Sequence, residues 1–580
     1  MRPATSPVEL TREYPRSFVP STASMGCWED IETIGRALLA RTPDTSQALQ
    51  RWLEDVSELT ACVSEERARR VIAMTSRVDD SERERDYTTF IHEIEPRWKQ
   101  LRFTLDVAFL QNPHRHALPA VCQVLDRRVE NRTGLFHEEN LPLLRREAEL
   151  TQEYVRLTTA SRVLFRGSEY TLQQMGSFLA DQDRATRKEA WEQIARHRLL
   201  VQDQMDELYD RLLRVRERIA TNAGVESFGL YKFRVYNRFD YTPQDCERLH
   251  DRIEAQVVPL AQSVARRRQR QLQVDRLRPW DLEVDPLGGP PLKPFKTVDE
   301  LIGKSEQAFS QVAPEFGRMF RFMRERGLLD LEHRKGKAPG GYQQDLDERR
   351  WPFIFMHATG LDSDVRTLHH EAGHAFHLLA SRDIPLLELR TPPTEFSELV
   401  AMAMELLTVP YLEWFYPRPA DRRRAYRERL ERTVTLIPWV ATIDAFSQWV
   451  YTHPGHTLQA RRSAWRHNYA RFQPSVDWSG YEDVLNCWWH GERHIFLFPF
   501  YYIAYAIAAI GALSVWQRAR TDYRDAVEMY RRALGQGGQL PLGELFAETG
   551  AQFDLEVPSL APLTSFLTDE LELAVAADSR

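Results

Sequence analysis

Four histidines and one glutamate lie close together in the stretch TLHHEAGHAFH, residues 367–377. If this stretch is helical, His370 and His374 lie on the same face, where both can bind one zinc ion at about 2.1 Å. Glu371 follows His370 directly, and its carboxylate can reach a water molecule on the open side of such a metal. The pattern H-E-x-x-H therefore predicts two metal ligands and a general base from one turn of helix.

The other two histidines of this stretch are expected to be core residues. His377 lies two helical turns, about 10 Å, from His370, which is too far for the two side chains to share one ion. His369 points to another side of the helix. The small residues Ala372 and Gly373 fill the two spacer positions of the motif and leave room beside the site.

The stretch TPPTEFSELVAMAMELL, residues 391–407, predicts a helix that carries a third ligand. It begins with Thr-Pro-Pro, a common helix start, and its apolar residues form one face. Glu395, Glu398 and Glu405 form a separate narrow stripe that contains no basic residue. We predict that Glu398 is the third metal ligand and that Glu405 accepts a hydrogen bond from a ligand histidine. Water would hold the fourth position, as a catalytic zinc site requires.

The composition is typical of a large globular protein. The chain has 580 residues, 43% hydrophobic and 28% charged, with a net charge of -7, so no basic field favours nucleic acid. Its five cysteines are never paired as C-x-x-C, and the N-terminus has no secretory signal, which together favour the cytoplasm. Residues 496–516 carry no charge, yet they include a proline and three tyrosines. We expect a buried helix there and no association with a membrane.

Apolar residues recur at helical spacing through most of the chain, as in residues 205–224. Strand signals are few and are found at 352–358 and in part of 336–343. We therefore predict a mainly α protein with one small sheet just before the histidine cluster. A soft boundary is expected between an N-terminal helical region, 1–190, and a catalytic region, 191–575.

Three segments, HHEAGHAFH, FSELVAMAME and WWHGERHIFLFPFYYIAYAIAAIGAL, resemble the zinc oligopeptidases of the thimet oligopeptidase and oligoendopeptidase F family, especially the bacterial oligoendopeptidase F-like branch. The interval between Glu398 and Glu405 matches the family's paired glutamates, and the resemblance extends over residues 160–560. It implies an elongated, two-lobed helical fold with a deep central channel, one Zn²⁺ per chain and a small β-sheet beside the zinc site. It also implies short, unstructured oligopeptides as substrates, because folded proteins cannot enter the channel.

The resemblance also implies which residues contact the peptide. The segment PFIFMHATG, with Ala358 and Gly360, would be the strand that pairs with an extended substrate. The segment GKAPGGY, with Gly340, Gly341 and Tyr342, would be a mobile glycine loop over the bound peptide.

The resemblance implies that the third segment, WWHGERHIFLFPFYYIAYAIAAIGAL, stabilises the transition state. Hydrolysis of a peptide bond builds negative charge on the carbonyl oxygen, and donors placed there contribute about 3 kcal/mol each. In the family, one histidine and two tyrosines from a C-terminal segment supply them. Here His494 matches best, and Tyr502 and Tyr505, at i and i+3, are the expected tyrosines. His490 and Tyr501 are the alternatives for these roles.

Some local features have more than one interpretation. Leu497 and Ala504 stand where close relatives carry acidic residues, so we expect activity with a change in peptide preference or in the electrostatics near the scissile bond. The stretch LDSDVR, residues 361–366, could cap the motif helix or assist substrate binding.

The leading hypothesis is a zinc endopeptidase that hydrolyses internal bonds of oligopeptides. One alternative is a zinc carboxypeptidase or aminopeptidase on a similar helical frame, which would remove single terminal residues instead. The other is a helical protein that binds peptides without cutting them, against which the intact set of site residues argues. The sequence predicts neither the preferred peptide nor the oligomeric state.

Overall fold

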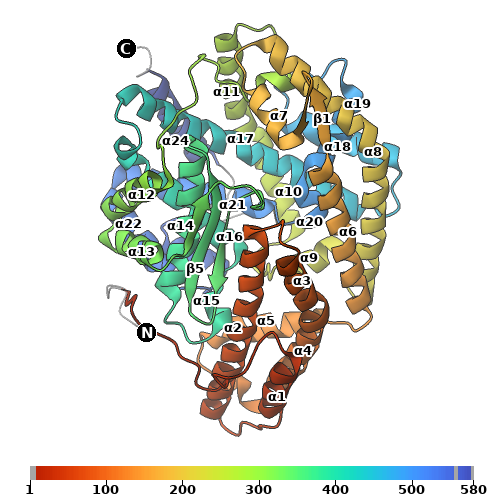
Figure 1. Cartoon of the computed structure of the whole chain (residues 1–580), viewed down its shortest axis with the longest axis vertical. Helices are drawn as coiled ribbons and strands as arrows, with labels where there is room; N and C mark the ends of the chain where they lie inside the picture. The colour runs from red at the N-terminus through yellow and green to blue at the C-terminus, as the bar shows by residue number, and fades with distance from the viewer. Residues whose placement is uncertain (1–7, 554–559, 577–580) are drawn as a thin grey trace. The chain divides into compact units, whose positions relative to one another are not determined.

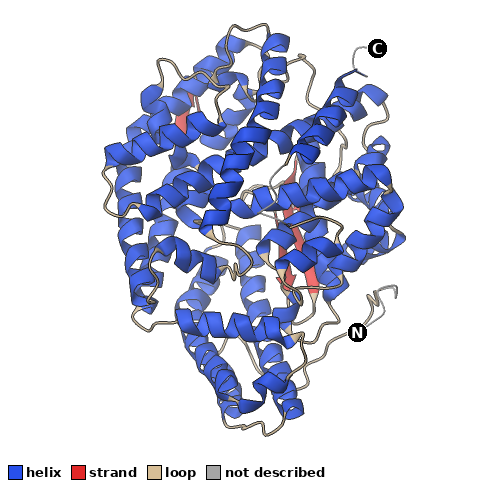
Figure 2. Cartoon of the chain, turned by 180° about the vertical axis from the view of Figure 1, so that it is seen from behind, coloured by secondary structure: helices blue, strands red, loops and turns tan. Residues whose placement is uncertain are grey.

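The computed structural model of the chain describes residues 8–553 and 560–576. Helices make up most of it, and strands occur in two small places (Figure 2). The prediction of a mainly α protein with a small sheet is therefore confirmed. Figure 1 labels the principal elements along the chain.

The chain forms two compact units, and each contains several separate segments. The first is built from the described parts of 1–134, 292–425 and 507–554. Its helices are α1 (Trp28–Leu39), α2 (Ser46–Ser76), α3 (Ser81–Thr89), α4 (Glu95–Gln111), α5 (Cys122–Leu135), α12 (Val298–Val312), α13 (Pro314–Glu325), α14 (Asp362–Ser381), α15 (Leu387–Arg390), α16 (Thr394–Leu407), α22 (Tyr523–Leu534) and α23 (Leu542–Glu548). Helix α5 ends at the boundary between the two units.

The second unit is built from the described parts of 135–291, 426–506 and 555–580. Its helices are α6 (Asn140–Ala160), α7 (Leu172–Leu179), α8 (Arg184–Asn222), α9 (Phe228–Val235), α10 (Pro243–Arg252), α11 (Val258–Leu272), α18 (Leu458–Phe472), α19 (Glu482–Cys487), α20 (Arg493–Leu497) and α24 (Ala561–Ala576). Two helices, α17 (Pro419–Thr452) and α21 (Ile503–Thr521), contain a unit boundary. The boundary expected near residue 190 lies inside α8, so the compact units do not divide the chain there.

The sheet of the first unit has three strands in the order β3 (Leu329–Glu332), β5 (Trp351–Ala358), β4 (Tyr342–Leu346). Strand β5 pairs in parallel with β3 and antiparallel with β4. The predicted strand at 352–358 is thus present, but it is the central strand. We expected this strand to pair with a substrate. Residues 351–355 cannot do so on the side of β4, because β4 is already paired with them.

The second unit contains a hairpin that the sequence pattern does not reveal. Strands β1 (Arg162–Phe165) and β2 (Ser168–Thr171) pair antiparallel through a two-residue turn. Both turn residues, Arg166 and Gly167, have positive φ, as a tight hairpin turn of this kind requires. The two strands read RVLF and SEYT, and neither alternates apolar and polar residues, which is the pattern that marks a half-buried strand.

The start of α14 resolves the role of the LDSDVR stretch. The Asp364 carboxylate accepts hydrogen bonds from the backbone N–H groups of Thr359 and Leu361, at 2.7 and 2.9 Å. Asp362 accepts one from the Tyr416 hydroxyl at 2.6 Å. Acidic side chains that satisfy free N–H groups at a helix N-terminus stabilise the helix. This stretch caps the motif helix and fixes its first turn.

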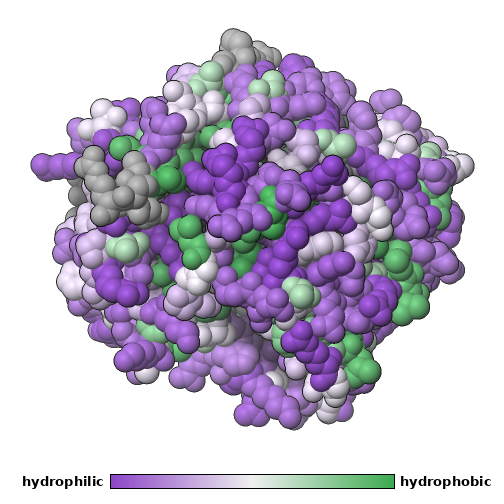
Figure 3. Space-filling view, turned by 90° about the horizontal axis from the view of Figure 1, so that it is seen from above, coloured by the Kyte–Doolittle hydropathy of each residue, from purple (hydrophilic) through white to green (hydrophobic). Residues whose placement is uncertain are grey.

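The apolar segment at 496–516 is divided between α20, a turn and α21. None of the helices in the described part of the chain is long and apolar enough to span a bilayer. The face of the molecule in Figure 3 carries mainly hydrophilic side chains. Within α21, Ala504, Ala508 and Leu513 are fully buried, as expected for a core helix.

Candidate metal centre and active site

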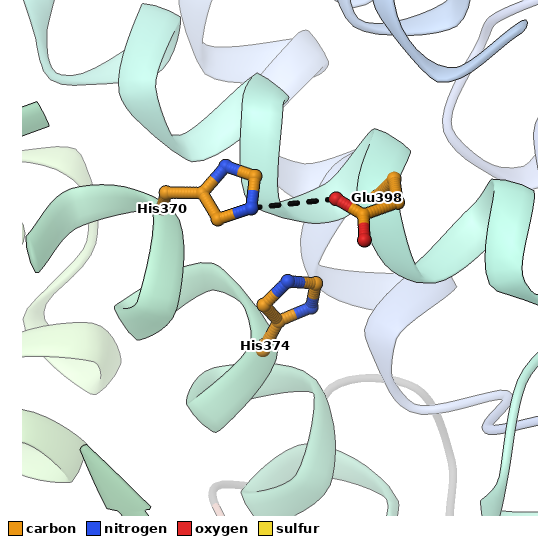
Figure 4. A group of neighbouring side chains, drawn as sticks. All are labelled: His370, His374 and Glu398. Atoms are coloured by element: carbon orange, nitrogen blue, oxygen red, sulfur yellow. Dashed lines mark ion pairs between the residues drawn. The ribbon is translucent and has the colours of Figure 1, made fainter. Parts of the chain in front are cut away.

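Three side chains of the first unit converge where α14 contacts α16. His370 and His374 extend from α14 and Glu398 from α16, and Figure 4 shows them facing one another. One ligand atom from each lies within 4.8 Å of the other two. His370 Nε2 and Glu398 Oε2 are 3.3 Å apart. Among the described residues, this is the one group of three or more histidine, cysteine or acidic side chains that could hold a metal ion.

The distances fit a tetrahedral zinc site. Ligand atoms at about 2.1 Å from a tetrahedral zinc lie about 3.4 Å from one another. The separation of His370 Nε2 and Glu398 Oε2 is close to this value. Glu398 is buried, and both histidines are half-buried. Two imidazoles and one carboxylate are the three protein ligands of a catalytic rather than a structural zinc site.

Both histidines are held so that Nε2 faces the centre. His370 Nδ1 lies 2.9 Å from Glu405 Oε1, as predicted for Glu405. His374 Nδ1 lies 3.0 Å from the Ser397 hydroxyl oxygen. Hydrogen bonds of this kind select the tautomer and orientation of ligand histidines. Sequence reasoning missed Ser397, although it directly precedes Glu398 in the helix.

The charges around the centre favour a cation. Burial lowers the pKa of His370, but hydrogen bonds to Glu398 and Glu405 outweigh burial and hold it well above its usual value. Burial lowers the pKa of His374 to about 4, so this imidazole is neutral at pH 7 and can donate a lone pair. The two carboxylates thus stabilise positive charge beside a neutral histidine. A divalent metal ion requires both an environment that stabilises positive charge and a neutral imidazole ligand.

Glu371 lies beside the metal centre and outside the group of three ligands. Its side chain is buried, and burial raises its pKa to about 7, with repulsion from Glu398 adding to the effect. The backbone of Gln343, in β4, acts in the opposite direction and lowers this pKa. A carboxylate whose pKa is near neutrality is suited to accept and release a proton.

The close approach of α14 and α16 depends on Gly373. A Cβ atom at this position would lie 2.6 Å from the Cα of Ala401 and 2.9 Å from the carbonyl oxygen of Val400. These are backbone atoms of the helix that carries Glu398, and they cannot rotate away as a side chain could. The absence of a side chain at Gly373 therefore allows the third ligand to reach the two histidines.

The two remaining histidines of the motif are core residues, as expected. His369 is fully buried between the rings of Phe309 and Phe415, at centroid distances of 4.9 and 5.5 Å, and its Nδ1 lies 2.8 Å from the Thr408 hydroxyl. His377 is buried against Phe396. Burial lowers the pKa of His377 to about 4.

The second unit brings together the residues predicted to stabilise the oxyanion. The ring centroid of His494 lies 4.5 Å from that of Tyr502 and 5.8 Å from that of Tyr505. The Tyr502 and Tyr505 rings are 5.4 Å apart. Tyr501, the alternative to these tyrosines, also contacts Tyr505, at a centroid distance of 5.5 Å. The three predicted residues do form one cluster.

His490 is engaged elsewhere in the second unit. It is buried, its Nε2 lies 3.0 Å from an Asp206 carboxylate oxygen, and its ring packs on Trp489. These contacts indicate that His490 has a structural role. Sequence reasoning overlooked Glu492, whose pKa is raised to about 7 by burial and whose charge acts on Tyr502. An acidic group therefore lies near the tyrosines despite Leu497 and Ala504.

The glycine loop lies at the start of β4. Gly340 has a φ of +105°, which favours glycine, and Gly341 packs against Thr367 of α14. Tyr342 stacks on Phe355 and its hydroxyl is 2.6 Å from that of Thr75, so its ring is held by the protein. Gly360 has a φ of +91° and lies two residues after the last residue of β5, Ala358.

Two packed helices that carry H-E-x-x-H and a glutamate as the third ligand are typical of a metallopeptidase. The chain belongs to peptidase family M3, whose sequence profile matches residues 177–563. Its substrates are therefore peptides. The sequence has no match among curated proteins.

Solved structures support the same class. PZ peptidase A with an inhibitor is 27% identical and has a TM-score of 0.89 over 96% of this chain and 99% of that chain. A protein provisionally named oligoendopeptidase F is 28% identical, with a TM-score of 0.88 over 96% and 99% of the two chains. Oligoendopeptidase F from Enterococcus faecium, at 14% identity and a TM-score of 0.63 over 95% and 98%, shares the fold.

Proposed function

We propose that this protein is a zinc-dependent endopeptidase that hydrolyses internal bonds of short, unstructured oligopeptides. The observation that carries the proposal is the convergence of His370, His374 and Glu398 with Glu371 beside them. The endopeptidase assignment is supported by similarity over nearly the whole chain to a protein provisionally named oligoendopeptidase F.

The proposed mechanism assigns one role to each side chain. A zinc ion held by His370, His374 and Glu398 would polarise the scissile carbonyl and make water a stronger nucleophile. Glu371 takes a proton from the attacking water and later passes it to the leaving amine. Glu405 keeps His370 in the tautomer that presents Nε2 to the metal.

We also propose that His494, Tyr502 and Tyr505 donate hydrogen bonds to the carbonyl oxygen as negative charge builds on it. The proposal is supported by their contact with one another and by the family resemblance. Burial raises the pKa of Tyr502 well above its usual value, so its hydroxyl keeps its proton at neutral pH and remains a donor.

Removal of either tyrosine hydroxyl is expected to slow catalysis strongly. Tyr502→Phe and Tyr505→Phe should each lower kcat/KM by about 100- to 1,000-fold, because each removes one oxyanion donor. Tyr501→Phe is the matched control on the neighbouring residue and should lose less than about threefold. Steady-state kinetics on one fluorogenic peptide would measure all three. A larger loss for Tyr501→Phe than for Tyr502→Phe would reassign the role to Tyr501.

The substrate backbone is proposed to lie along the outer edge of β4, next to Glu371. The backbone N–H of Ile354 donates to Leu328 in the direction of β3, so in this register the opposite residue, Gln343, points its N–H and C=O away from β5. An extended peptide could pair with that edge. Gly340, Gly341, Ala358 and Gly360 are proposed to contact the bound peptide.

A cytoplasmic location completes the proposal. It is supported by five cysteines that form no disulfide with one another. Four of them are buried, and burial raises the pKa of Cys62 to about 12 and that of Cys487 to about 11. Such thiols are poor nucleophiles and act as core residues.

Cleavage positions test the proposed function. A mixture of unstructured peptides about 5 to 30 residues long would be incubated with the protein, with and without a zinc chelator, and analysed by mass spectrometry. We expect internal cuts, mainly in the shorter peptides, that disappear on chelation. Stepwise loss of single terminal residues would support the exopeptidase alternative. Peptide binding without any cleavage would support the inactive alternative.

A further inference from the structure

The small sheet lies between a helix of the N-terminal region and the motif helix. Tyr342 pairs with Phe355 in the register and stacks on it, at 4.8 Å and 11°, so the two rings share one face of the sheet. The C-terminal end of α2 contacts this face, because Thr75 bonds Tyr342 and Ser76 bonds Asp330 of β3. The alternate residues, including Gln343 and Ile354, belong to the other face.

Three hydrogen bonds join the end of α2 to the glycine loop and the first residue of β4. The hydroxyl oxygens of Thr75 and Tyr342 are 2.6 Å apart. The backbone N–H of Ala338 donates to the carbonyl oxygen of Thr75 at 2.7 Å. The backbone N–H of Val78 donates to the carbonyl oxygen of Gly336 at 2.7 Å. We call this set of bonds the α2 clamp.

The loop is also held from the sheet side. Lys337 is fully buried, and its ammonium donates to the carbonyl oxygens of Asp330, Glu332 and Met356. The first half of the glycine loop is therefore fixed by both α2 and the strand ends. The expectation of a mobile loop thus applies at most to the part around Gly340.

The residue before Tyr342 connects this framework to the motif helix. Gly341 packs against α14, because a Cβ atom there would lie 3.0 Å from Thr367 Cγ2. Thr367 lies one helical turn before Glu371. Gly341 and Tyr342 are adjacent, so a shift of the Tyr342 backbone changes the contact of Gly341 with this turn of the helix.

We propose that the end of α2 is a positioning element of the active site: the α2 clamp holds Gly341 and β4 against the motif helix, one turn from Glu371, and so fixes the position of the Glu371 carboxylate. Thr75 and Tyr342 are positioning residues in this scheme and do not contact the reacting atoms. The inference rests on the proposed function, because it assumes that Glu371 is the general base. It assigns a task to the N-terminal helices, which lie outside the segment matched by the family profile.

The test removes the clamp hydroxyls and preserves the shapes of the side chains. Tyr342→Phe keeps the ring stacked on Phe355, and Thr75→Val keeps the carbonyl that Ala338 uses. Each variant should lower kcat about 5- to 10-fold, the equivalent of one hydrogen bond, with KM within about twofold. The double variant should fall no further than either single variant, because both remove the same bond. Thr75→Ser retains a hydroxyl and should restore kcat to near the wild-type value.

Two control variants each remove a comparable hydroxyl group at a position away from the glycine loop. Tyr14→Phe removes a tyrosine hydroxyl bonded to Asp383 at 2.6 Å in the same unit. Thr104→Val removes an exposed helical threonine hydroxyl in α4. Both should leave kcat and KM unchanged. A drop in kcat in these controls equal to that of the clamp variants would overturn the proposal, because it would indicate a general loss of stability.

Hydrogen exchange supplies a readout that does not depend on turnover. Backbone amides in residues 336–346 should exchange faster in Tyr342→Phe and Thr75→Val than in wild type, with and without zinc, while bound zinc stays at the wild-type level. Unchanged exchange and unchanged kcat would overturn the clamp. A rise in KM alone would also overturn it, since that result would place Tyr342 in substrate binding. A wild-type protein that cleaves no peptide would refute the proposed function, and exchange would still decide the clamp.

Discussion

Glu371→Gln is expected to retain the metal and to lose about 100- to 10,000-fold of turnover, the contribution typical of a general base. Glutamine has the same shape as glutamate, so we expect it to occupy the same place in α14. It has no basic oxygen that can take a proton from water. The three ligand side chains are untouched, since Glu371 lies outside their group.

This expectation separates a base from a structural carboxylate. Zinc content by elemental analysis and the melting temperature should match wild type, while kcat falls. Glu332→Gln, which changes an exposed carboxylate at the end of β3, is the matched control and should keep full activity. A Glu371→Gln variant that still cleaves peptides at more than about one tenth of the wild-type rate would remove Glu371 from the role of general base.

Glu398→Gln is expected to abolish zinc binding at physiological concentrations and with it nearly all activity. A neutral amide is a poorer zinc ligand than a carboxylate, and only two histidines of the set would remain. We expect zinc affinity to fall by more than about 100-fold, beyond the 10- to 100-fold range typical of a group that only orients a ligand.

Glu405→Gln, on the same helix, is the variant with which Glu398→Gln is compared. Its amide oxygen can still accept a hydrogen bond from His370 Nδ1, so zinc affinity should fall only about tenfold. Competition with a chromogenic chelator would measure both affinities. Equal losses in the two variants would mean that Glu398 and Glu405 act together as an acidic pair, and the assignment of Glu398 as the direct ligand would be withdrawn.

The metal centre could be predicted because its determinants are local. His370, Glu371 and His374 lie within two turns of one helix, where spacing alone fixes which side chains face one another. Glu398 and Glu405 are on another helix, yet the stripe of acids without a base marks the face that approaches a cation. The small spacer at Gly373 also has a visible consequence, the close contact with Ala401.

The contacts that support the centre could not be predicted in the same way. Ser397 binds His374 across two helices, and a serine next to a glutamate has no distinctive pattern. Thr75 is far from Tyr342 in the sequence, and their bond exists only because α2 packs on the sheet.

The central position of β5 was missed because one of its two neighbours is hard to recognise. Strand β3 is only four residues long and alternates charged and apolar residues, LDLE, which also fits a helix end. Without β3, β5 has no second neighbour and is interpreted as an edge strand.

Zinc titration of the metal-free protein tests the central claim most directly. The protein would be stripped with a chelator, then supplied with increasing zinc while peptide cleavage and bound metal are measured together. Cleavage should rise in proportion to bound zinc and reach its maximum at about one zinc per chain, and Glu398→Gln should show neither binding nor cleavage over the same range. Full cleavage by the metal-free wild-type protein, or undiminished zinc binding by Glu398→Gln, would contradict the assignment of this site as the catalytic metal centre.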